Sequence, residues 1–204
     1  MPIREDEAPK KRWKACRKCQ ARMKKEGLAD ENELQSWFIK RMETFINKNG
    51  KKLIGWDEIP EGGLAPNAAL MSWRGTKGGE RAVKEGHDVV MSPTSHCYFD
   101  YNYKRISIMK SYEYEPVPVG FDEGQAYRIL GAQANFWSHI DRTEDSLAKQ
   151  LLPRLLSIAE VTWSPKEKRD RLYFKEKVKS HLCRLAALGV KYYPDSTITS
   201  IVNQ

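Results

Sequence analysis

The 204-residue chain combines 40% hydrophobic residues with a formal net charge of +8. This apolar content is sufficient for a packed core and excludes the composition of a disordered chain. The longest apolar runs fall short of the ~20 residues that a membrane helix needs, and the opening MPIREDE lacks the apolar segment of a secretory signal. We therefore expect one globular domain with no membrane partner and no export signal.

The positive charge is concentrated between Lys10 and Lys25, where Lys and Arg residues are dense. Such a cluster is typical of a nucleic-acid-binding surface. The segment contains a single aromatic residue, Trp13, on which a base could stack. A small basic nucleic-acid-binding module acting through Lys10 to Lys25 therefore stands as an alternative function.

The four cysteines give little sign of a metal site. Cys16 and Cys19 form a CxxC pair, whereas Cys97 and Cys183 stand alone in the sequence. A zinc ribbon needs a second pair to complete its four ligands. The four histidines also lack metal-ligand spacing. We expect free thiols rather than a zinc site.

The first clear helical pattern starts at Asp30. Asp30 and Glu33 have the spacing of a helix cap, and apolar residues then recur every three or four positions from Leu34 to Ile46. The pair Asn49-Gly50 is a typical helix end. The sequence thus predicts an amphipathic helix between Asp30 and Asn49.

Short strand and helix patterns alternate after this helix. Three segments have the composition of strands: KLIGW (52–56), AALMSW (68–73) and DVVMS (88–92). Two segments between them have the composition of loops, DEIPEGG and GTKGG, and a short helix ending at Gly86 is predicted for ERAVKEG. Strands that alternate with helices are joined by right-handed crossovers in a parallel sheet. The expected fold class is therefore α/β.

The rest of the chain is predicted to be a loop, a strand and two helical stretches. Pro93 to Glu123, rich in tyrosine, has the character of a long functional loop. ILGAQANFW (129–137) predicts a further strand. The first helical stretch should break at Pro153, and the second should run from about Pro165 to Leu188.

Aromatic and acidic residues follow the predicted strands. Parallel α/β enzymes build their sites at the carboxyl ends of strands. These ends carry Trp56-Asp57-Glu58, Trp73-Arg74 and Trp137-Ser138-His139, with Tyr98 and Asp100 in the long loop. Aromatic rings with carboxylates between them suit a sugar, which offers apolar C–H faces and hydroxyl donors. Glycoside hydrolysis also needs a carboxylic acid, and Asp6-Glu7 offers a pair.

Other common chemistries lack their motifs. The sequence contains no GxSxG, no P-loop, no HExxH and no glycine fingerprint after a predicted strand. Acyl transfer by a serine nucleophile, P-loop phosphoryl transfer and zinc proteolysis are therefore disfavoured. A sugar-directed site remains the best-supported interpretation of the residues.

Four segments together resemble the catalytic domain of glycoside hydrolase family 20, the β-N-acetylhexosaminidases. They are IREDEAPKKRWKACRKCQ, LIGWDEIPEGGLAPNAALMSWRG, VVMSPTSHCYFDY and LGAQANFWS. The family fold is a (β/α)8 TIM barrel, and a full barrel takes about 250 residues. The resemblance implies a partial barrel, strands 5 to 8 with their helices, and it implies that residues 1–204 are the C-terminal part of a catalytic barrel with no second domain.

The resemblance also implies a retaining, substrate-assisted mechanism, in which the sugar's 2-acetamido oxygen attacks the anomeric carbon. Asp6 would orient the acetamido N–H, and Glu7 would act as general acid and then as general base. In the family this pair follows two glycines, whereas Arg4 and Glu5 stand there in this chain. We therefore expect that sequence upstream of the pair has been lost.

The resemblance assigns further residues to substrate binding. Tyr98 would donate a hydrogen bond to the acetamido oxygen, and Asp100 would bind a sugar hydroxyl or the leaving side. His139 stands where the family commonly has a glutamate for the 4- and 6-hydroxyls. The aromatic box around the sugar would comprise Trp56, Trp73 and Trp137.

The implied partner is a glycan with a β-linked N-acetylglucosamine or N-acetylgalactosamine, with no cofactor, no metal and no nucleic acid. Full-length relatives are often exported, and the sequence leaves localisation and oligomeric state open. An inactive fragment is a second alternative, because the arginine that grips the sugar in the family would lie in an absent half. As an isolated monomer the chain is expected to be poorly stable and inactive.

Overall fold

The computed structural model describes residues 2–3, 9–57, 64–137 and 143–199. These residues belong to two compact units. The first unit comprises Met1–Met91 and Phe121–Leu130, and the second comprises Ser92–Gly120 and Gly131–Gln204.

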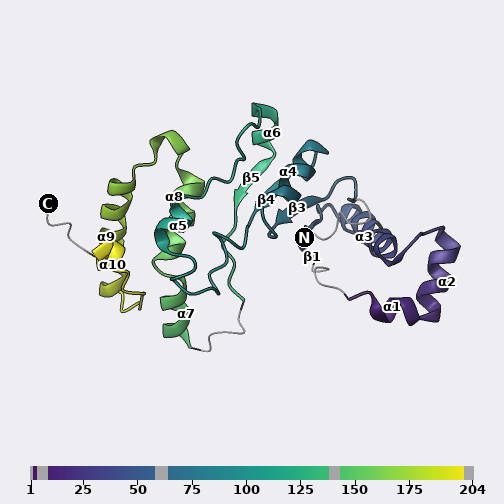
Figure 1. Ribbon diagram of the computed structural model, residues 1–204, viewed down its shortest axis with the longest axis horizontal. Coiled ribbons are helices and arrows are strands. Elements are labelled where there is room, and N and C mark those ends of the chain that lie inside the picture. Colours follow the sequence, from purple (N-terminus) through teal and green to yellow (C-terminus); the bar gives the residue numbers. More distant parts are fainter. Residues whose placement is uncertain (1, 4–8, 58–63, 138–142, 200–204) are drawn as a thin grey trace. The chain divides into compact units, whose positions relative to one another are not determined.

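A parallel sheet organises the first unit (Figure 1). Strands β1 (Pro2–Ile3), β2 (Ile54–Trp56), β3 (Ala69–Ser72) and β4 (Val89–Met91) pair in parallel, each with the next along the chain. Strand β5 (Ile129–Ala132) is next in the order, which is β1-β2-β3-β4-β5 among the described residues. A doubly wound sheet reverses direction at a switch point, whereas a barrel adds its strands in chain order. The observed order is therefore that of a barrel segment.

Helix α3 (Glu31–Lys48) follows two short basic helices, α1 (Lys11–Ala15) and α2 (Arg17–Glu26). The Asp30 carboxylate accepts hydrogen bonds from the backbone N–H groups of Asn32 and Glu33, both at 2.9 Å. These bonds satisfy two N–H groups that would otherwise lack a partner at the start of α3. The buried face of α3 contributes to a core cluster of Ile39, Ile46, Leu53, Ala65 and Ala68.

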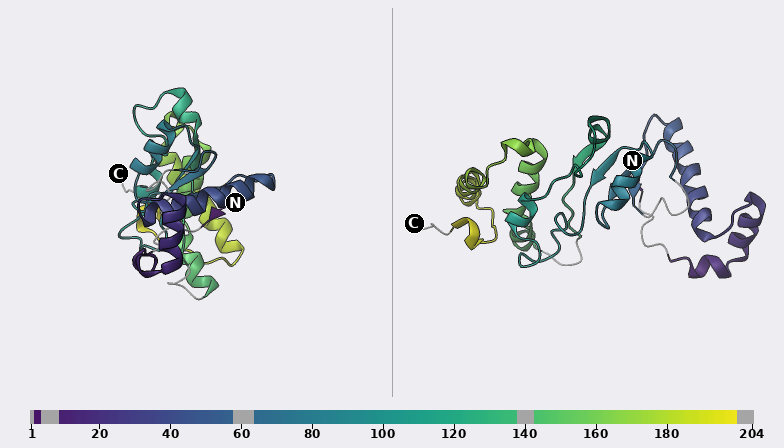
Figure 2. Two further views of the ribbon diagram at one scale, coloured as in Figure 1. Left: turned by 90° about the vertical axis from the view of Figure 1, so that its right-hand side faces the viewer. Right: turned by 45° about the horizontal axis from the view of Figure 1, so that its top comes forward.

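Helix α4 (Lys77–Lys84) packs against β3 and β4 (Figures 1 and 2). A Cβ added at Gly79 would lie 2.8 Å from the Met91 Sδ and 3.1 Å from the Val89 Cγ1. Glycine is therefore required for this close approach of helix to sheet. The remaining helix of the first unit, α6 (Glu123–Tyr127), begins with a capping box at Asp122.

The second unit is mainly helical. It contains α5 (Ile108–Tyr112), α7 (Glu144–Leu151), α8 (Arg154–Trp163), a 3-10 turn (Lys166–Lys168), α9 (Arg171–Ala187) and α10 (Ser196–Thr199). Helix α5 packs on α8, and α10 packs on α9 (Figure 1). Their apolar faces form one cluster of Ile108, Met109, Tyr112, Phe174, Val178, Leu182 and Ile198.

Several predicted elements are confirmed. The helix capped by Asp30 ends at Lys48, and the helical stretch after Thr143 breaks at Pro153 into α7 and α8. The four predicted strands are present, each shorter than its apolar run. A further short strand, β1, pairs with β2 ahead of Asp6. No helix in the described ranges is long and apolar enough to cross a membrane.

Other expectations were wrong. GTKGG was expected to be a loop because of its glycines, but α4 already starts at Lys77 because those glycines let the helix approach the sheet. The segment from Pro93 to Glu123 was expected to be a loop, yet it contains α5, which the Ser107 hydroxyl caps. The last long helix starts at Arg171 rather than near Pro165, because Asp170 caps it and the 3-10 turn precedes it.

Candidate active site

The expected site residues fall into three sets. Trp56 and Trp73 lie in the first unit, and Tyr98, Asp100 and Trp137 lie in the second. Asp6, Glu7 and His139 lie outside the described residues, so the roles expected for them stay predictions.

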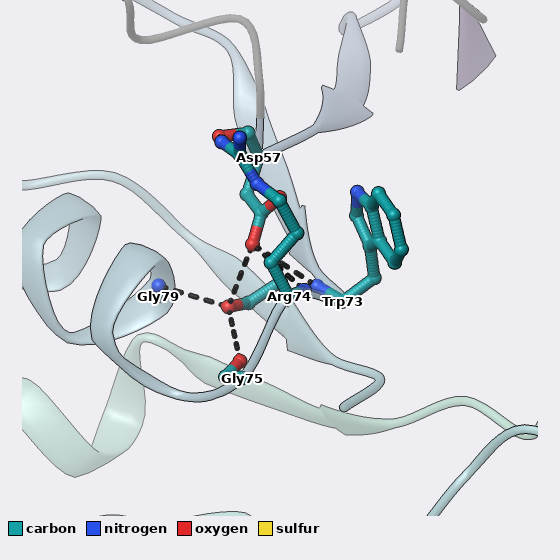
Figure 3. Close-up of polar contacts among 6 residues, drawn as sticks. Asp57, Trp73, Arg74, Gly75 and Gly79 are labelled. Carbon is teal, nitrogen blue, oxygen red and sulfur yellow. Dashed lines mark hydrogen bonds and ion pairs between the residues drawn. The ribbon is translucent and has the colours of Figure 1, made fainter. Parts of the chain in front are cut away.

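Strands β2 and β3 end next to a buried carboxylate, Asp57 (Figure 3). The Asp57 side chain is only 2% exposed. Its Oδ2 accepts hydrogen bonds from the backbone N–H groups of Trp73 and Arg74, both at 3.2 Å, and its Oδ1 accepts one from the Arg74 Nε at 2.9 Å. The Arg74 Nη2 also donates to the Asp57 carbonyl at 2.5 Å. These bonds tie Trp56, the residue before Asp57, to the backbone of Trp73.

Ser72 extends this network to α4 (Figure 3). Its hydroxyl lies 2.8 Å from the Gly75 carbonyl and 3.4 Å from the Asp57 Oδ2, and it accepts a hydrogen bond from the Gly79 N–H at 3.0 Å. The Trp73 indole points away from this polar cluster in Figure 3. The network therefore fixes the backbone that carries the indole.

Tyr98 and Trp137 come together in the second unit. Phe99 N–H donates to the Asn135 carbonyl and Asn135 N–H donates to the Cys97 carbonyl, both at 2.7 Å, so residues 97–99 and 135 form a parallel bridge. The rings of Tyr98 and Trp137 then lie 6.4 Å apart between centroids, with their planes inclined by 48°. This tilted geometry is favourable for two aromatic rings. Residues separated by 39 positions in the sequence thus form one aromatic wall.

Asp100 follows this wall and carries an unusual oxygen. Its Oδ1 is buried and has no hydrogen-bond partner in the described part of the chain. Buried polar atoms are nearly always satisfied, so an unsatisfied one requires an explanation. An acceptor of this kind is suited to a donor group on a ligand, such as a hydroxyl.

Burial shifts the pKa values of three groups that lie close to Asp100 in the sequence. Burial raises the pKa of Cys97 to about 12, which keeps its thiol protonated. Burial also lowers the pKa of His96, whose ring stacks on Tyr114 at 5.1 Å. Burial raises the pKa of Tyr103 to about 12, and its hydroxyl donates to the Leu152 carbonyl at 2.7 Å.

The basic segment and its cysteine pair make local contacts within the first unit. The Lys10 ammonium lies 5.5 Å from the centroid of the Trp13 ring, within the range of a cation–π contact. Cys16 caps α2, with its sulfur 3.4 Å from the Cys19 N–H. Within the described ranges, no three His, Cys, Asp or Glu side chains gather where they could hold a metal ion.

Sequence reasoning noted Asp57 and Arg74 at the strand ends but gave them no supporting role. It missed Gln150 and Arg154, whose side chains donate hydrogen bonds to the backbone carbonyls on either side of Asp100. Asp57 and Arg74 had a signal, since each directly follows a tryptophan at a strand end. Gln150 and Arg154 had almost none. The one signal for Arg154 is its apolar surroundings in the sequence LLPRLL, which is an unusual place for a charged residue.

Comparison with a protein-family model identifies the family of the chain. The model for the catalytic domain of glycosyl hydrolase family 20 matches residues 3–166, which is most of the sequence. The chain belongs to glycoside hydrolase family 20. The resemblance predicted from the four segments is thereby confirmed.

Curated relatives of this family 20 chain include a β-hexosaminidase of Porphyromonas gingivalis, 44% identical over 92% of this chain and 26% of that protein. The human β-hexosaminidase subunit beta is 28% identical over 93% of this chain and 34% of that protein. The chain thus spans about a quarter to a third of the length of these curated relatives.

Solved structures of the family have the same fold. The GH20 exo-β-N-acetylglucosaminidase from Vibrio harveyi, solved with N-acetylglucosamine, matches with a TM-score of 0.85 and 30% identity, over 94% of this chain and 32% of that chain. The chitobiase from Flavobacterium johnsoniae matches with a TM-score of 0.79 and 32% identity, over 93% of this chain and 29% of that chain. Together with the parallel sheet, these matches show that the family 20 chain has the fold of a partial α/β barrel.

Proposed function

We propose that the chain takes part in the hydrolysis of terminal, non-reducing N-acetylhexosamine residues from β-linked glycans. The observation that carries this proposal is the family match over residues 3–166, which runs through every segment holding an expected site residue. The paired rings of Tyr98 and Trp137 and the unsatisfied Asp100 oxygen support it, since they suit a sugar face and a hydroxyl.

The chain is proposed to supply the second half of the barrel, strands 5 to 8. The sequential order of its strands supports a barrel segment, and the assignment to the second half rests on the resemblance of the motifs to the family. Strand β1, which ends at Ile3 just before the Asp6-Glu7 pair, would then be the end of the fourth strand. The pair would follow the carboxyl end of a barrel strand, which is where barrel enzymes carry their catalytic groups.

The proposed mechanism is retaining and substrate-assisted. The acetamido oxygen of the sugar attacks the anomeric carbon while Glu7 protonates the leaving glycosidic oxygen. Asp6 orients the acetamido N–H and stabilises the positive charge that develops on the acetamido group. Water then attacks the anomeric carbon, the bond between this carbon and the acetamido oxygen breaks, and Glu7 takes the proton of the water. No enzyme nucleophile and no cofactor is needed.

The other expected residues are proposed to hold the sugar. The Tyr98 hydroxyl donates to the acetamido oxygen, which fixes the direction of its attack. Asp100 accepts a hydrogen bond from a sugar hydroxyl or on the leaving side, and His139 contacts the far hydroxyls. The indoles of Trp56, Trp73 and Trp137 pack against the apolar faces of the acetamido group and the ring.

The test uses the protein expressed from its complete gene, as defined by the DNA on both sides of these 204 codons. We expect hydrolysis of 4-nitrophenyl N-acetyl-β-glucosaminide with retention of the anomeric configuration, followed by NMR. The control is 4-nitrophenyl β-glucoside, which lacks the acetamido nucleophile and should not react. Comparable hydrolysis of the two substrates, or an inverted product, would contradict the proposed mechanism.

A further inference from the structure

Arg154, the first residue of α8, is fully buried, with 0% of its surface exposed. A buried guanidinium normally pairs with a carboxylate, because an isolated charge is costly to remove from water. Here its hydrogen-bond acceptors in the described part of the chain are backbone carbonyl oxygens. The acceptors belong to Phe99, Tyr101, Ile106 and Gln150.

These hydrogen bonds use all five guanidinium N–H groups. The Nη2 donates to the Phe99 carbonyl at 2.7 Å, and the Nη1 donates to the Tyr101 carbonyl at 2.7 Å and the Ile106 carbonyl at 3.1 Å. The rings of Phe99 and Tyr103 flank the guanidinium at 4.8 Å and 4.1 Å. Hydrogen bonds therefore hold the edges of the planar guanidinium, and the two aromatic rings contact its faces.

A second side chain binds the same two carbonyls. The Gln150 Nε2 donates to the Phe99 carbonyl at 2.7 Å and to the Tyr101 carbonyl at 3.0 Å. Each of the carbonyls on either side of Asp100 thus accepts two hydrogen bonds, one from Gln150 and one from Arg154. The backbone around Asp100 has little freedom to rotate.

The electrostatics agree with this arrangement. Burial lowers the pKa of Arg154, whereas the nearby Tyr103 and Asp100 act in the opposite direction. The positive charge thus lies close to Asp100, although its hydrogen bonds go to the backbone. Among the described residues, the buried Asp100 Oδ1 accepts no hydrogen bond, so its capacity to accept one is unused.

We propose that Arg154 is a positioning residue, which acts with Gln150 to fix the orientation of Tyr98 and Asp100 toward the sugar. This inference rests on the proposed function, because it needs Tyr98 and Asp100 to bind substrate. Arg154 itself does not touch the sugar. A lysine at this position would keep the charge, but one ammonium group cannot span carbonyls that the guanidinium fork reaches together. Small misplacements of binding groups reduce turnover strongly.

The test is a double-mutant cycle on the protein expressed from its complete gene, with kcat/KM for 4-nitrophenyl N-acetyl-β-glucosaminide as the readout. Tyr98→Phe removes a donor to the acetamido oxygen and should lower kcat/KM about 100-fold. In an Arg154→Lys background, where Tyr98 is no longer held in place, the same change should cost only about fivefold.

The matched control is Val161→Ala, a cavity-forming change at a buried position of the same helix. It should lower stability without touching residues 99–101, so Tyr98→Phe should keep its full effect in that background. The unfolding free energy of each variant is measured alongside, so that stability and positioning are separated.

Three results would overturn the inference. An equal effect of Tyr98→Phe in the wild-type and Arg154→Lys backgrounds would mean that Arg154 is only structural, and the proposed function would stand. Equal attenuation in the Val161→Ala background would mean that the coupling reflects stability alone. No effect of Tyr98→Phe in the wild type would remove the assigned role of Tyr98 and the positioning role with it.

Discussion

The buried Asp57 carboxylate allows a sharp test of what holds the ends of β2 and β3 together. Asp57→Asn keeps the shape of the side chain but removes its charge and replaces one acceptor oxygen with an NH2 group. That NH2 group would face either the Arg74 Nε–H or the two backbone N–H groups that the carboxylate now accepts. Every orientation of the amide therefore loses at least one hydrogen bond.

The size of the effect follows from burial and from the number of donors. Hydrogen bonds to a charged group contribute about 1.5–3 kcal/mol each, and an unsatisfied buried donor adds to the cost. The backbone contacts at 3.2 Å are long, and the Arg74 side chain is 44% exposed, so its charge can be solvated when the pair is broken. We expect a loss of about 2–3 kcal/mol in unfolding free energy.

The chain offers a matched control in Glu85→Gln. Glu85 and Arg81 form the same kind of ion pair, with the Arg81 Nε 2.7 Å from the carboxylate, but their side chains are 41% and 69% exposed. An exposed helical pair of this type contributes about 0.3–0.5 kcal/mol. The two variants therefore share the chemistry of the substitution and differ in burial and in the number of donors to the carboxylate.

The assay is urea unfolding of the protein expressed from its complete gene, followed by tryptophan fluorescence, since Trp56 and Trp73 adjoin the network. Activity on the N-acetylglucosaminide is measured in parallel and should fall for Asp57→Asn, because Trp73 loses its backbone anchor. If Asp57→Asn destabilised the protein no more than Glu85→Gln, the network would not be what stabilises these strand ends.

Three further predictions concern the dyad, the thiols and the chain itself. Glu7→Gln should lower turnover most for substrates with poor leaving groups, while Asp6→Asn should impair all leaving groups alike; equal losses for Glu7→Gln on alkyl and activated aryl substrates, in the glycosylation step, would contradict an acid role. At pH 8 the exposed Cys183 should react with iodoacetamide well before the buried Cys97, because burial raises the pKa of Cys97 to about 12; early alkylation of Cys97, mapped by mass spectrometry, would show that its site opens. Unfolding restores the ordinary Cys97 pKa of 9.0, so ionisation of this thiol should favour the unfolded state progressively above pH 9. The isolated 204-residue chain should be inactive and should unfold without a cooperative transition unless it self-associates, because a partial barrel leaves sheet edges unpaired. Sedimentation, calorimetry and an aryl-glycoside assay measure its oligomeric state, its unfolding and its activity. A chain that is monomeric, unfolds cooperatively and is active would refute this prediction.

Local signals in the sequence were sufficient for several elements. The helix after Asp30 could be predicted because its cap, its apolar spacing and its glycine end act within one or two turns. The break at Pro153 was predictable for the same reason, since proline restricts its own backbone. The family was recognisable because its motifs are contiguous segments, such as LIGWDEIPEGG.

The expectations that were wrong depended on contacts that the sequence does not display. Glycine usually weakens a helix, so the start of α4 could not be predicted without the sheet that Gly79 approaches. The helix α5 was hidden in a polar, tyrosine-rich segment, because its helical state is stabilised by packing on α8 rather than by its own composition.

The sequence by itself determined which residues of this chain are candidates for sugar chemistry, because residue types and their order in motifs are local properties. Only the tertiary structure decided which side chains hold those candidates in place. Asp57 meets Arg74 across 17 positions, and Arg154 reaches the Phe99 carbonyl across 55. Such contacts form when strands and helices pack, and they involve backbone carbonyl and N–H groups that every residue possesses. No pattern of side chains along the sequence distinguishes the few carbonyls that a buried arginine will bind.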